Sequence, residues 1–351
     1  MAEEAAHMHK VVTFGEIMLR LNPPAFERLH RARLFEGTYG GGEANVAASL
    51  ANYGIDVEFV SVLPRNELGD ACVSLLRQHG VLTNHILRGG DRMGIYFLET
   101  GVAQRPSKVV YDRAGSSFAT ARVGTVDWRG ALAGADWLHW TGITPAVSQS
   151  AAEVCLEGVK LARELGMIVS CDLNFRAKLW KWTDAPGSVM QVLVSHCDVA
   201  IGNEEDAAKV FGIHAPGTDV ARGKLDPRRY PAVCEELGRR FPNLNTIAIT
   251  LRGSLSASHN SWSAVMMHAG RFMVGPSYEI EPIVDRVGSG DAFGAGLIYG
   301  LLSYGDDYER ALGFAVAASC LKHTIAGDFN AVSVREVEQL MTGDASGRIA
   351  R

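Results

Sequence analysis

The segment Asp285-Arg-Val-Gly-Ser-Gly-Asp291-Ala-Phe-Gly-Ala-Gly, near the C-terminal end of the chain, decides most about its fold and chemistry. A β-branched, acidic stretch runs into Gly288-Ser289-Gly290, and an apolar helical pattern starts at once with Asp291. Three small residues at a helix N-terminus leave backbone N–H groups unpaired, and the helix dipole adds positive potential at the same place. The segment therefore predicts an anion hole at a strand-to-helix turn.

The acid that follows this turn needs a task of its own, because a carboxylate is poorly placed to bind phosphate. Taking a proton from an attacking hydroxyl is such a task, so Asp291 is a candidate general base for phosphoryl transfer to an alcohol. The alternative is a plain tight turn in which Asp291 only caps the helix. Three helix glycines, each costing about 1 kcal/mol relative to Ala, favour the functional interpretation. They indicate that another backbone or a ligand approaches closely at Gly294, Gly296 and Gly300.

Other phosphate-binding signatures are missing from the sequence. No G-x-x-x-x-G-K-[ST] run occurs, which excludes a P-loop enzyme. The Gly288-x-Gly290 start does not match the dinucleotide pattern, because Phe293 stands where its third glycine belongs. A dinucleotide oxidoreductase is therefore a distant alternative, and the chain also lacks H-E-x-x-H, H-R-D and G-x-S-x-G.

Composition is that of a globular protein with a sizeable core, since 47% of the 351 residues are apolar and 21% are charged. The net charge of -5 argues against a nucleic-acid surface, and no apolar stretch is long enough to span a membrane. The six cysteines form neither a metal-binding spacing nor a disulfide framework, which favours reduced thiols in the cytoplasm. We expect a flexible leader over residues 1–9 and a loose tail over 342–351.

Short apolar runs alternate with amphipathic helical patterns along residues 10–341, which predicts a mainly parallel sheet covered by helices on both faces. The candidate strands are Val11–Phe14, Val57–Val62, Trp137–Trp140, Ile168–Cys171, Val199–Ile201 and Thr246–Leu251. The clearest helical patterns are Asn45–Tyr53, Leu68–His79, Ser148–Leu165 and Arg229–Phe241. Segments 17–39 and 94–113 lack helices, and we expect them to form a small β-layer that serves as a lid. The Gly/Pro-bearing insertion 212–227 is expected to be a surface loop.

A second glycine-rich element, Gly40-Gly41-Gly42-Glu43-Ala44-Asn45-Val46-Ala47, completes a family resemblance. Together with the Asp285–Gly290 turn it resembles the two signatures of the ribokinase (PfkB-type) family of sugar kinases. Nearly the whole chain, from Val11 to Met341, fits that family's order of elements. The resemblance implies a three-layer α/β sandwich with a β-sheet lid, and an enzyme that uses ATP and Mg²⁺.

A finer resemblance rests on Asp172-Leu-Asn-Phe-Arg176-Ala-Lys-Leu-Trp180, preceded by Tyr96 and by Tyr111-Asp-Arg113. This combination is similar to 2-keto-3-deoxygluconate kinases, which phosphorylate the terminal 6-hydroxyl of the sugar acid. It implies that Asp291 is the catalytic base and that Gly288, Ser289 and Gly290 form the anion hole. The residues around the sugar acid would then be Gly41, Asn45, Tyr96, Tyr111, Arg113 and Arg176.

The same resemblance implies a nucleotide and metal side. Asn203 and Asp206 match an N-x-x-E element near Mg²⁺ and the phosphates, with Asp206 acting through water because Asp replaces Glu. Asp285 and the Val287 carbonyl match a monovalent-cation site, for which K⁺ is the expected ion, although Arg286 stands where Thr is common. The residues expected to contact the nucleotide are Asn203, Thr250, Arg252, Gly253, Gly288 and Gly290.

Substrate chemistry and assembly can also be predicted. Ribokinase has an acid where this chain has Arg20, which argues against a neutral pentose. Arginine forks at Arg113 and Arg176 suit a carboxylate, which supports a sugar acid. The alternatives are a fructokinase, a 5-dehydro-2-deoxygluconokinase, and a sugar- or nucleotide-binding regulator without catalysis. Because the predicted lid would expose open strand edges, we expect a homodimer formed through it.

Overall fold

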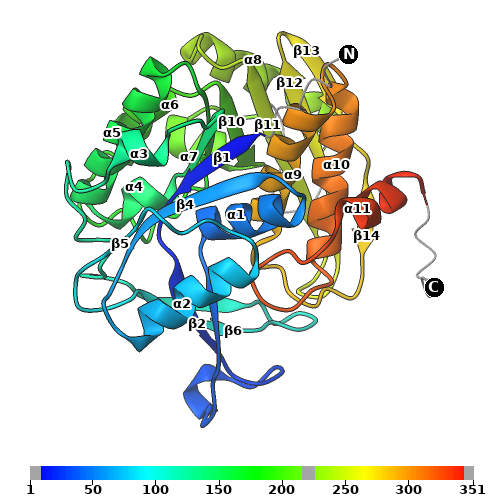
Figure 1. Ribbon diagram of the computed structural model, residues 1–351. Coiled ribbons are helices and arrows are strands. Elements are labelled where there is room, and N and C mark those ends of the chain that lie inside the picture. Colours follow the sequence, from blue (N-terminus) through cyan, green and yellow to red (C-terminus); the bar gives the residue numbers. More distant parts are fainter. Residues whose placement is uncertain (1–8, 216–225, 344–351) are drawn as a thin grey trace, which may run out of the picture.

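The computed structural model describes residues 9–215 and 226–343 of the chain. Most of the predicted leader, the middle of the 212–227 insertion and most of the predicted tail lie outside the described residues. The predicted α/β architecture is confirmed, with one large sheet between two helical layers and a separate small sheet (Figure 1).

The large sheet contains ten strands in the order β13-β12-β11-β10-β9-β8-β1-β4-β5, with β14 paired to β12. Its strands from β11 to β5 are parallel, and β12, β13 and β14 are antiparallel. The parallel strands are β1 (Lys10–Phe14), β4 (Asp56–Leu63), β5 (Ile86–Arg88), β8 (Trp137–Thr141), β9 (Ile168–Asp172), β10 (Val199–Asn203) and β11 (Thr246–Ser254). The antiparallel strands are β12 (Asn260–His268), β13 (Arg271–Val274) and β14 (Tyr278–Ile280).

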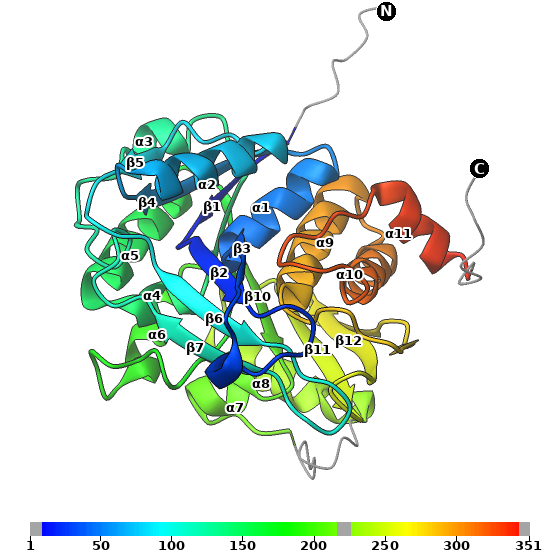
Figure 2. The ribbon, with the colours of Figure 1, turned by 90° about the horizontal axis from the view of Figure 1, so that it is seen from below.

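Two hydrophobic cores form because successive strand residues point to opposite faces of the sheet. In β1, Val12 and Phe14 join one core, whereas Val11 joins the other. A parallel sheet covered on both faces reads as a continuous apolar run, which is why the strands could be predicted. Figures 1 and 2 show one helical layer on each side of the sheet.

The first layer consists of α1 (Gly42–Asn52), α2 (Glu67–Gln78), α9 (Ser289–Ser303), α10 (Tyr308–Lys322) and α11 (Val334–Met341). The second consists of α3 (Trp128–Ala131), α4 (Ile143–Val147), α5 (Gln149–Glu164), α6 (Pro186–Val194), α7 (Asp206–Phe211) and α8 (Pro231–Arg240). Short 3-10 turns, η1 (Leu29–Arg31) and η3 (Pro227–Arg229), complete the described elements.

The small sheet has the order β3-β2-β6-β7 and projects from the carboxyl side of the main sheet (Figure 1). Its strands are β2 (Met18–Asn22), β3 (Glu36–Gly40), β6 (Ile95–Glu99) and β7 (Lys108–Asp112), which lie in the two segments expected to form a β-layer except that β3 extends one residue further. It joins the main domain directly, because β3 runs into α1 at Gly41. The small sheet therefore stands beside the glycine-rich start of α1.

Helix α9 packs unusually close to α10, and its glycines account for this. A Cβ at Gly296 would stand 2.8 Å from the Ala315 Cα, and one at Gly300 would stand 2.6 Å from the Ala311 Cα. At Gly294 a Cβ would make only an ordinary contact with Ile201. The close neighbour predicted from these glycines is therefore the backbone of α10 and not a ligand.

One local expectation needs correction. The acidic stretch before the Gly-Ser-Gly turn is not a continuous strand, because β14 ends at Ile280 and the chain continues through a cis Glu281–Pro282 bond without regular structure. The turn is instead held by side chains, since Arg286 donates to the Ser256 and Ala257 carbonyls at 3.3 and 2.7 Å. The turn at α9 is therefore reached from an irregular segment.

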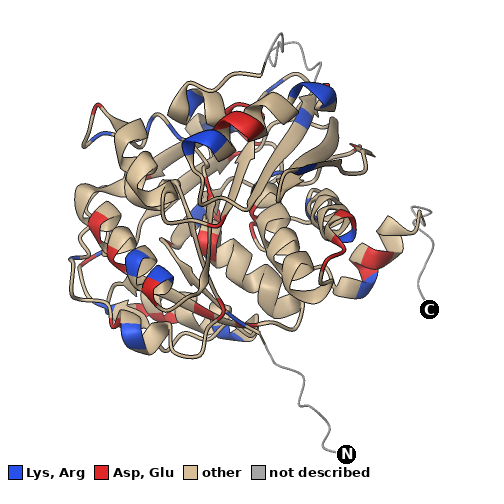
Figure 3. Ribbon diagram, turned by 90° about the horizontal axis from the view of Figure 1, so that it is seen from above, with Lys and Arg blue, Asp and Glu red and all other residues tan. Residues whose placement is uncertain are grey.

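Charged residues of both signs are scattered over the peripheral helices, while α9 and α10 carry charge only near their ends (Figure 3). Among the residues described, no helix combines the length and the apolar character needed to cross a bilayer.

Candidate active site

The glycine turn before α9 is closed on one side and open on the other. Gly288 precedes the helix in the left-handed conformation, with φ of 84°, and a Cβ there would stand 2.1 Å from the Asp328 carbonyl oxygen. Both facts require glycine. A Cβ at Gly290 would meet nothing within 4 Å, so the turn faces open space on that side. The start of α9 can therefore receive a ligand at its N-terminus.

Asp291 joins the two signature segments. Its Oδ2 accepts a hydrogen bond of 2.6 Å from Asn45 Nδ2, although the two residues lie 246 positions apart. Asn45 Oδ1 in turn accepts from the Gly41 amide at 3.3 Å, and a Cβ at Gly42 would stand 3.5 Å from Asp291 Oδ1. The structure thus brings together the predicted residues Gly41, Asn45 and Asp291.

The environment of Asp291 favours a base that works near neutral pH. Removal of the carboxyl group from bulk water raises the pKa of Asp291 to about 6, and the Asn45 hydrogen bond offsets part of this rise. Asp328 raises the same pKa, whereas Arg176 and Lys322 lower it. A carboxyl group with a pKa just below 7 is mostly ionised at neutral pH and accepts a proton more readily than an ordinary aspartate.

Two further carboxylates stand near the base. Asp172 ends β9, and burial first, then Asp206 and Asp291, raises its pKa well above the usual value. The positive charge of Arg176 lowers the pKa of all three carboxyl groups. Arg176 is exposed, and its side-chain hydrogen bond goes to the Phe175 carbonyl at 3.1 Å, without an ion pair to Asp172 among the described residues. The guanidinium of Arg176 therefore lies near the site and is accessible to a ligand.

The small sheet contributes a row of three side chains. Arg20 on β2 is the register partner of Tyr96 on β6, and Tyr96 is the partner of Tyr111 on β7. The Tyr96 hydroxyl donates to Asp328 at 2.6–2.7 Å, while Tyr111 is 37% exposed. Tyr96 is thus already engaged, and Tyr111 remains accessible.

Arg113 follows β7 and is buried. Its Nε donates to Glu16 Oε2 at 2.7 Å, and its Nη2 also pairs with that carboxylate. Ser116 donates to the second Glu16 oxygen at 2.5 Å. Among the described residues, Arg113 Nη1 has no hydrogen-bond partner although it is buried. Only one nitrogen of the Arg113 fork is therefore available for a ligand.

A buried ion-pair network connects the small sheet to the glycine turn. Arg20 donates to Asp285 Oδ2 at 2.6 Å and to Asp328 Oδ1 at 2.7 Å, and all three residues are buried. In the sequence, Arg20 argued only against a neutral pentose as substrate, and no contact was predicted for it. Its guanidinium is committed to these two carboxylates, so it does not face a ligand with a free fork.

Asn203 ends β10, and its register partner Thr250 lies in the middle of β11, with Arg252 and Gly253 further toward the carboxyl end of that strand. Thr250 Oγ1 donates to the Gly202 carbonyl at 3.4 Å, and Arg252 Nη2 lies 3.9 Å from Glu204 Oε1. Gly253 follows Arg252 within β11. These residues share the sheet edge that Asp172 and the glycine turn occupy.

Asp206 is buried at the start of α7 and organises the backbone around it. It accepts from the Phe175 amide at 3.1 Å and from the Asn203 amide at 2.9 Å. Each carboxylate oxygen keeps a second lone pair, which fits a contact to a metal-bound water but not a crowded direct ligand set.

Three acids around the site were not predicted as site residues. Glu43 accepts from the Thr141 amide, the Thr141 hydroxyl and the Thr144 hydroxyl, and burial raises its pKa to about 7. Glu43 belongs to the glycine-rich element and Glu16 follows the first strand, so sequence offered a signal for both. Asp328 lies in an irregular segment after α10, and no pattern marked it.

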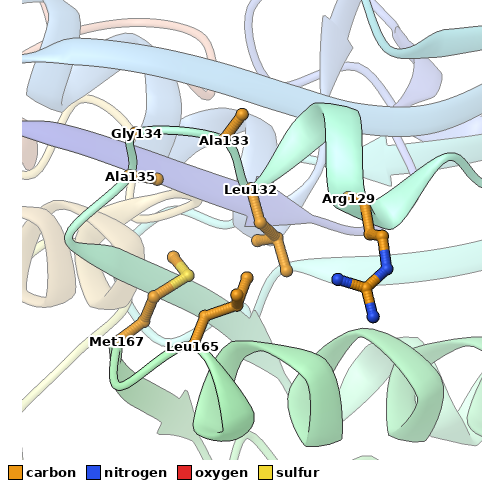
Figure 4. Close-up of a pocket in the computed structure, with 7 residues that line it drawn as sticks. All are labelled: Arg129, Leu132, Ala133, Gly134, Ala135, Leu165 and Met167. Atoms are coloured by element: carbon orange, nitrogen blue, oxygen red, sulfur yellow. The ribbon is translucent and has the colours of Figure 1, made fainter.

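A separate pocket lies at the opposite edge of the sheet, next to the amino ends of β8 and β9 (Figure 4). Its lining is mainly aliphatic, with the Arg129 side chain at one side: Arg129, Leu132, Ala133, Gly134, Ala135, Leu165 and Met167. None of the predicted site residues lines it. Ligands of such sheets bind at the carboxyl ends, so this pocket is not the candidate active site.

Comparisons with known proteins agree with this geometry. Residues 8–332 match the family described as pfkB family carbohydrate kinase. A 2-dehydro-3-deoxygalactonokinase from Haloferax volcanii is 34% identical over 342 residues, covering 96% of this chain and 98% of that protein. A crystal structure of 2-dehydro-3-deoxygluconokinase from Thermotoga maritima is 49% identical with a TM-score of 0.89, covering 95% of this chain and 100% of that one.

A putative ribokinase from E. coli, solved with ATP and Mg²⁺, is 18% identical with a TM-score of 0.79, covering 95% of this chain and 99% of that one. At that identity the likeness shows the fold alone. The family match covers most of the chain, and the relative from Haloferax volcanii aligns over almost its full length. This protein belongs to the pfkB family of carbohydrate kinases.

Proposed function

We propose that this kinase transfers the γ-phosphoryl group of ATP to the terminal 6-hydroxyl of 2-keto-3-deoxy-D-gluconate. The observation that carries the proposal is Asp291, a carboxylate with a pKa of about 6, held by Asn45 directly after the open glycine turn. Asp291 would take the hydroxyl proton as the alkoxide oxygen attacks the γ-phosphorus. The bond to the β-phosphate oxygen breaks, and ADP leaves with that electron pair.

The backbone amides of Gly288, Ser289 and Gly290 would bind the negative charge that develops on the transferred group. Glycine at positions 288 and 290 fits this role. The Asp328 carbonyl leaves no room for a side chain at Gly288, and Gly290 faces open space where a ligand can approach. On the nucleotide side we assign Asn203, Thr250, Arg252 and Gly253 to the ATP phosphates and ribose, because they lie where β10 ends and along the part of β11 that continues beyond it.

Mg²⁺ would neutralise charge on the phosphates when it is bound. Among the described residues, no group of three or more metal-ligating side chains occurs. This agrees with Mg²⁺ sites in which phosphate oxygens and water supply most ligands. Asp206 would contact such a water with its remaining lone pairs while it holds the amides of Asn203 and Phe175.

Two arginines support a sugar acid as substrate. Arg176 is exposed beside the three carboxylates, and Arg113 keeps one buried nitrogen, Nη1, without a partner among the described residues. A buried unsatisfied donor is costly, and a substrate carboxylate would satisfy it. We assign the carboxylate end to Arg113 and Arg176, and Tyr111 to the middle of the sugar acid. We assign Tyr96, with its hydroxyl already bound to Asp328, to the wall of the site.

The proposal is tested by ADP release with a panel of acceptors. We expect the highest kcat/KM with 2-keto-3-deoxygluconate or its C4 epimer 2-keto-3-deoxygalactonate, and the position of the new phosphate should be carbon 6. A higher kcat/KM with fructose or 5-dehydro-2-deoxygluconate would favour those alternatives. The absence of ADP release with every acceptor would instead favour a binding protein without catalysis.

The pKa of Asp291 predicts a pH profile. Because the base must be ionised, kcat/KM should be constant at high pH and fall about tenfold per pH unit below about pH 6. The measurement is kcat/KM for the keto acid between about pH 5 and about pH 8. A flat profile over that range would contradict the assigned base, and a residual activity of Asp291→Asn should lack this limb.

We also propose that two chains associate through the small sheet. All five residues of its edge strand β7 are exposed, and Val109, Val110 and Tyr111 are 41%, 53% and 37% exposed. Apolar residues on an open strand edge favour pairing with another strand. Because Tyr111 and Arg113 adjoin this edge, the contact would frame both active sites.

Light scattering should give the mass of a dimer, and Val110→Lys should shift it toward the monomer and lower kcat/KM. A matched control is Val274→Lys, since Val274 is 54% exposed on the edge strand β13 of the large sheet. The control should leave the mass unchanged. A fully active monomeric parent at assay concentration would contradict the proposed interface.

All six cysteines are unpaired, and five of them are buried. Reduced thiols of this kind are typical of cytoplasmic proteins, and we propose that location for the enzyme.

A further inference from the structure

Lys322 is a buried cation directly behind the glycine turn. It is the last residue of α10 and has no exposed surface. A Cβ at Gly288 would stand 3.3 Å from the Lys322 Cε atom, so the lysine side chain passes against the back of the turn. Lysine is rarely buried completely, because removing an ammonium group from water is costly. Such a position therefore calls for a physical reason.

Lys322 lies in polar surroundings that carry charges of both signs. Its Nζ donates to the Ile325 carbonyl at 3.1 Å, just beyond the C-terminal end of α10, where the helix dipole is negative. Burial lowers the pKa of Lys322 and the positive charge of Arg20 lowers it further, whereas the carboxylates of Asp285, Asp328 and Asp291 offset part of this fall. The ammonium group thus has a backbone carbonyl as its hydrogen-bond partner and feels the negative charge of three carboxylates, none of which forms a direct ion pair with it in the described part of the chain.

Asp285 already accepts three hydrogen bonds from groups of the protein itself. Its Oδ1 accepts from the Val287 amide at 3.0 Å, and its Oδ2 accepts from Arg20 Nη2 at 2.6 Å and from the Gly327 amide at 3.2 Å. The carboxylate expected to bind K⁺ therefore already has a guanidinium as its counter-ion. The Asp285 carboxylate, paired with Arg20, does not fit the monovalent-cation site that the family resemblance implies.

Charge balance leads to the same conclusion. Arg20 and Lys322 supply two positive charges, and Asp285 and Asp328 supply two negative charges, all on buried side chains. A K⁺ ion added here would be a third cation without a buried partner, and uncompensated charge is strongly disfavoured in a protein interior. The charges of these four buried side chains therefore balance without a bound ion, and the third acid, Asp291, is only partly buried and is assigned to the proton transfer.

We infer that Lys322, together with Arg20, is a built-in replacement for a monovalent cation, and that this kinase works without K⁺. The inference rests on the proposed phosphoryl transfer. Lys322 acts as a positioning residue: its ammonium group fixes the segment after α10 against Gly288 and adds positive potential behind the anion hole. Because the cation is covalently part of α10, it is present at every turnover whatever the salt.

The first test compares the parent enzyme in potassium, sodium and tetramethylammonium chloride at equal ionic strength. Tetramethylammonium is too large for a K⁺ site, so a K⁺-dependent enzyme would lose activity in it. We expect kcat to stay within about twofold across the three salts, and the thermal unfolding midpoint to be the same in K⁺ and tetramethylammonium. A loss of tenfold or more in tetramethylammonium that K⁺ reverses would overturn the inference.

The second test removes the charge with Lys322→Met, which keeps the length and apolar character of the stem. In tetramethylammonium we expect kcat to fall by about 10- to 100-fold, the size expected when a catalytic loop is misplaced. Added K⁺ should restore part of this loss, because the vacated place then accepts the ion. Lys160→Met on the exposed face of α5 is the matched control and should show neither effect.

A folded Lys322→Met enzyme with unchanged kcat in tetramethylammonium, or one that K⁺ does not rescue, would refute the role given to Lys322. If this variant does not fold, the comparison of the parent enzyme in the three salts tests the inference by itself. The unfolding midpoints in K⁺ and tetramethylammonium test it even if no acceptor is phosphorylated. Failure of the proposed function looks different, since the parent would then release no ADP with any sugar acid in any salt.

Discussion

Replacing Asp291 by asparagine is expected to lower kcat by about 10²–10⁴-fold, the usual range for loss of a general base. The substitution keeps the shape of the side chain, and the amide oxygen can still accept the 2.6 Å hydrogen bond from Asn45. Ligand binding should therefore persist, so KM for the sugar acid should change far less than kcat. Steady-state kinetics with the keto acid and ATP measures both values.

Stability should separate this effect from misfolding. The folded-state pKa of Asp291, about 6, lies above the ordinary value of 3.8, so ionisation near neutral pH costs the folded state stability. A neutral asparagine avoids that cost, and the variant should unfold at the same temperature as the parent or a higher one. Asp307→Asn, at the N-cap of α10, is a matched control, because asparagine caps a helix equally well. Activity of Asp291→Asn within a few-fold of the parent would reject the assigned base.

Arg176→Ala is expected to lower kcat/KM for the keto acid by about 10- to 150-fold. This range corresponds to the 1.5–3 kcal/mol or so that a hydrogen bond to a charged partner contributes. Arg176→Lys keeps the charge and loses the planar fork, so it should still be clearly impaired. Arg176 suits this test better than Arg113, because loss of Arg113 would leave the buried Glu16 carboxylate unpaired and destabilise the fold.

The comparison compound is an analogue whose acid group has been reduced to an alcohol. Loss of Arg176 should damage kcat/KM for the keto acid far more than for this analogue. Arg129→Ala, an exposed arginine at the opposite edge of the sheet, should affect neither compound. Equal damage to both compounds would mean that Arg176 is structural or contacts ATP, and the sugar-acid assignment would lose its main physical support.

The central sheet could be predicted from sequence because each parallel strand is buried on both faces. Strands such as β4 and β8 therefore appear as short, mainly apolar runs, in which the few polar residues are buried as well. The antiparallel edge was harder to predict. In β12, Ser261 and Ser263 alternate with buried residues, and the pairing with β11 and β13 depends on contacts that no local pattern contains.

The site was predicted where function requires particular residues close together in sequence. Gly288 and Asp291 belong to one such segment, and Asn45 belongs to another. The pairing of their side chains is a tertiary contact across 246 positions, which only the family resemblance indicated. Asp328 was missed because its role depends on Arg20 and Tyr96, which are distant in sequence and themselves carried no signal for this contact.

The partners of the arginine side chains also could not be predicted from the sequence. An isolated arginine in a sequence does not reveal its partner, and Arg113 is largely neutralised by Glu16 while Arg176 remains exposed. Whether the Asp285 carboxylate can bind a cation likewise depends on which side chain lies next to it in the folded protein. That neighbour is Arg20, supplied by a strand of the small sheet.

The most direct test of the account is a crystal structure with the keto acid and a non-hydrolysable ATP analogue. We expect the terminal hydroxyl oxygen of the keto acid to lie within about 2.6–3.2 Å of the Asp291 carboxylate, between that group and the γ-phosphate. The acid end should lie against Arg113 Nη1 and the Arg176 fork. A keto acid bound with its carboxylate toward Asp291 and the glycine turn, or bound away from both arginines, would contradict it.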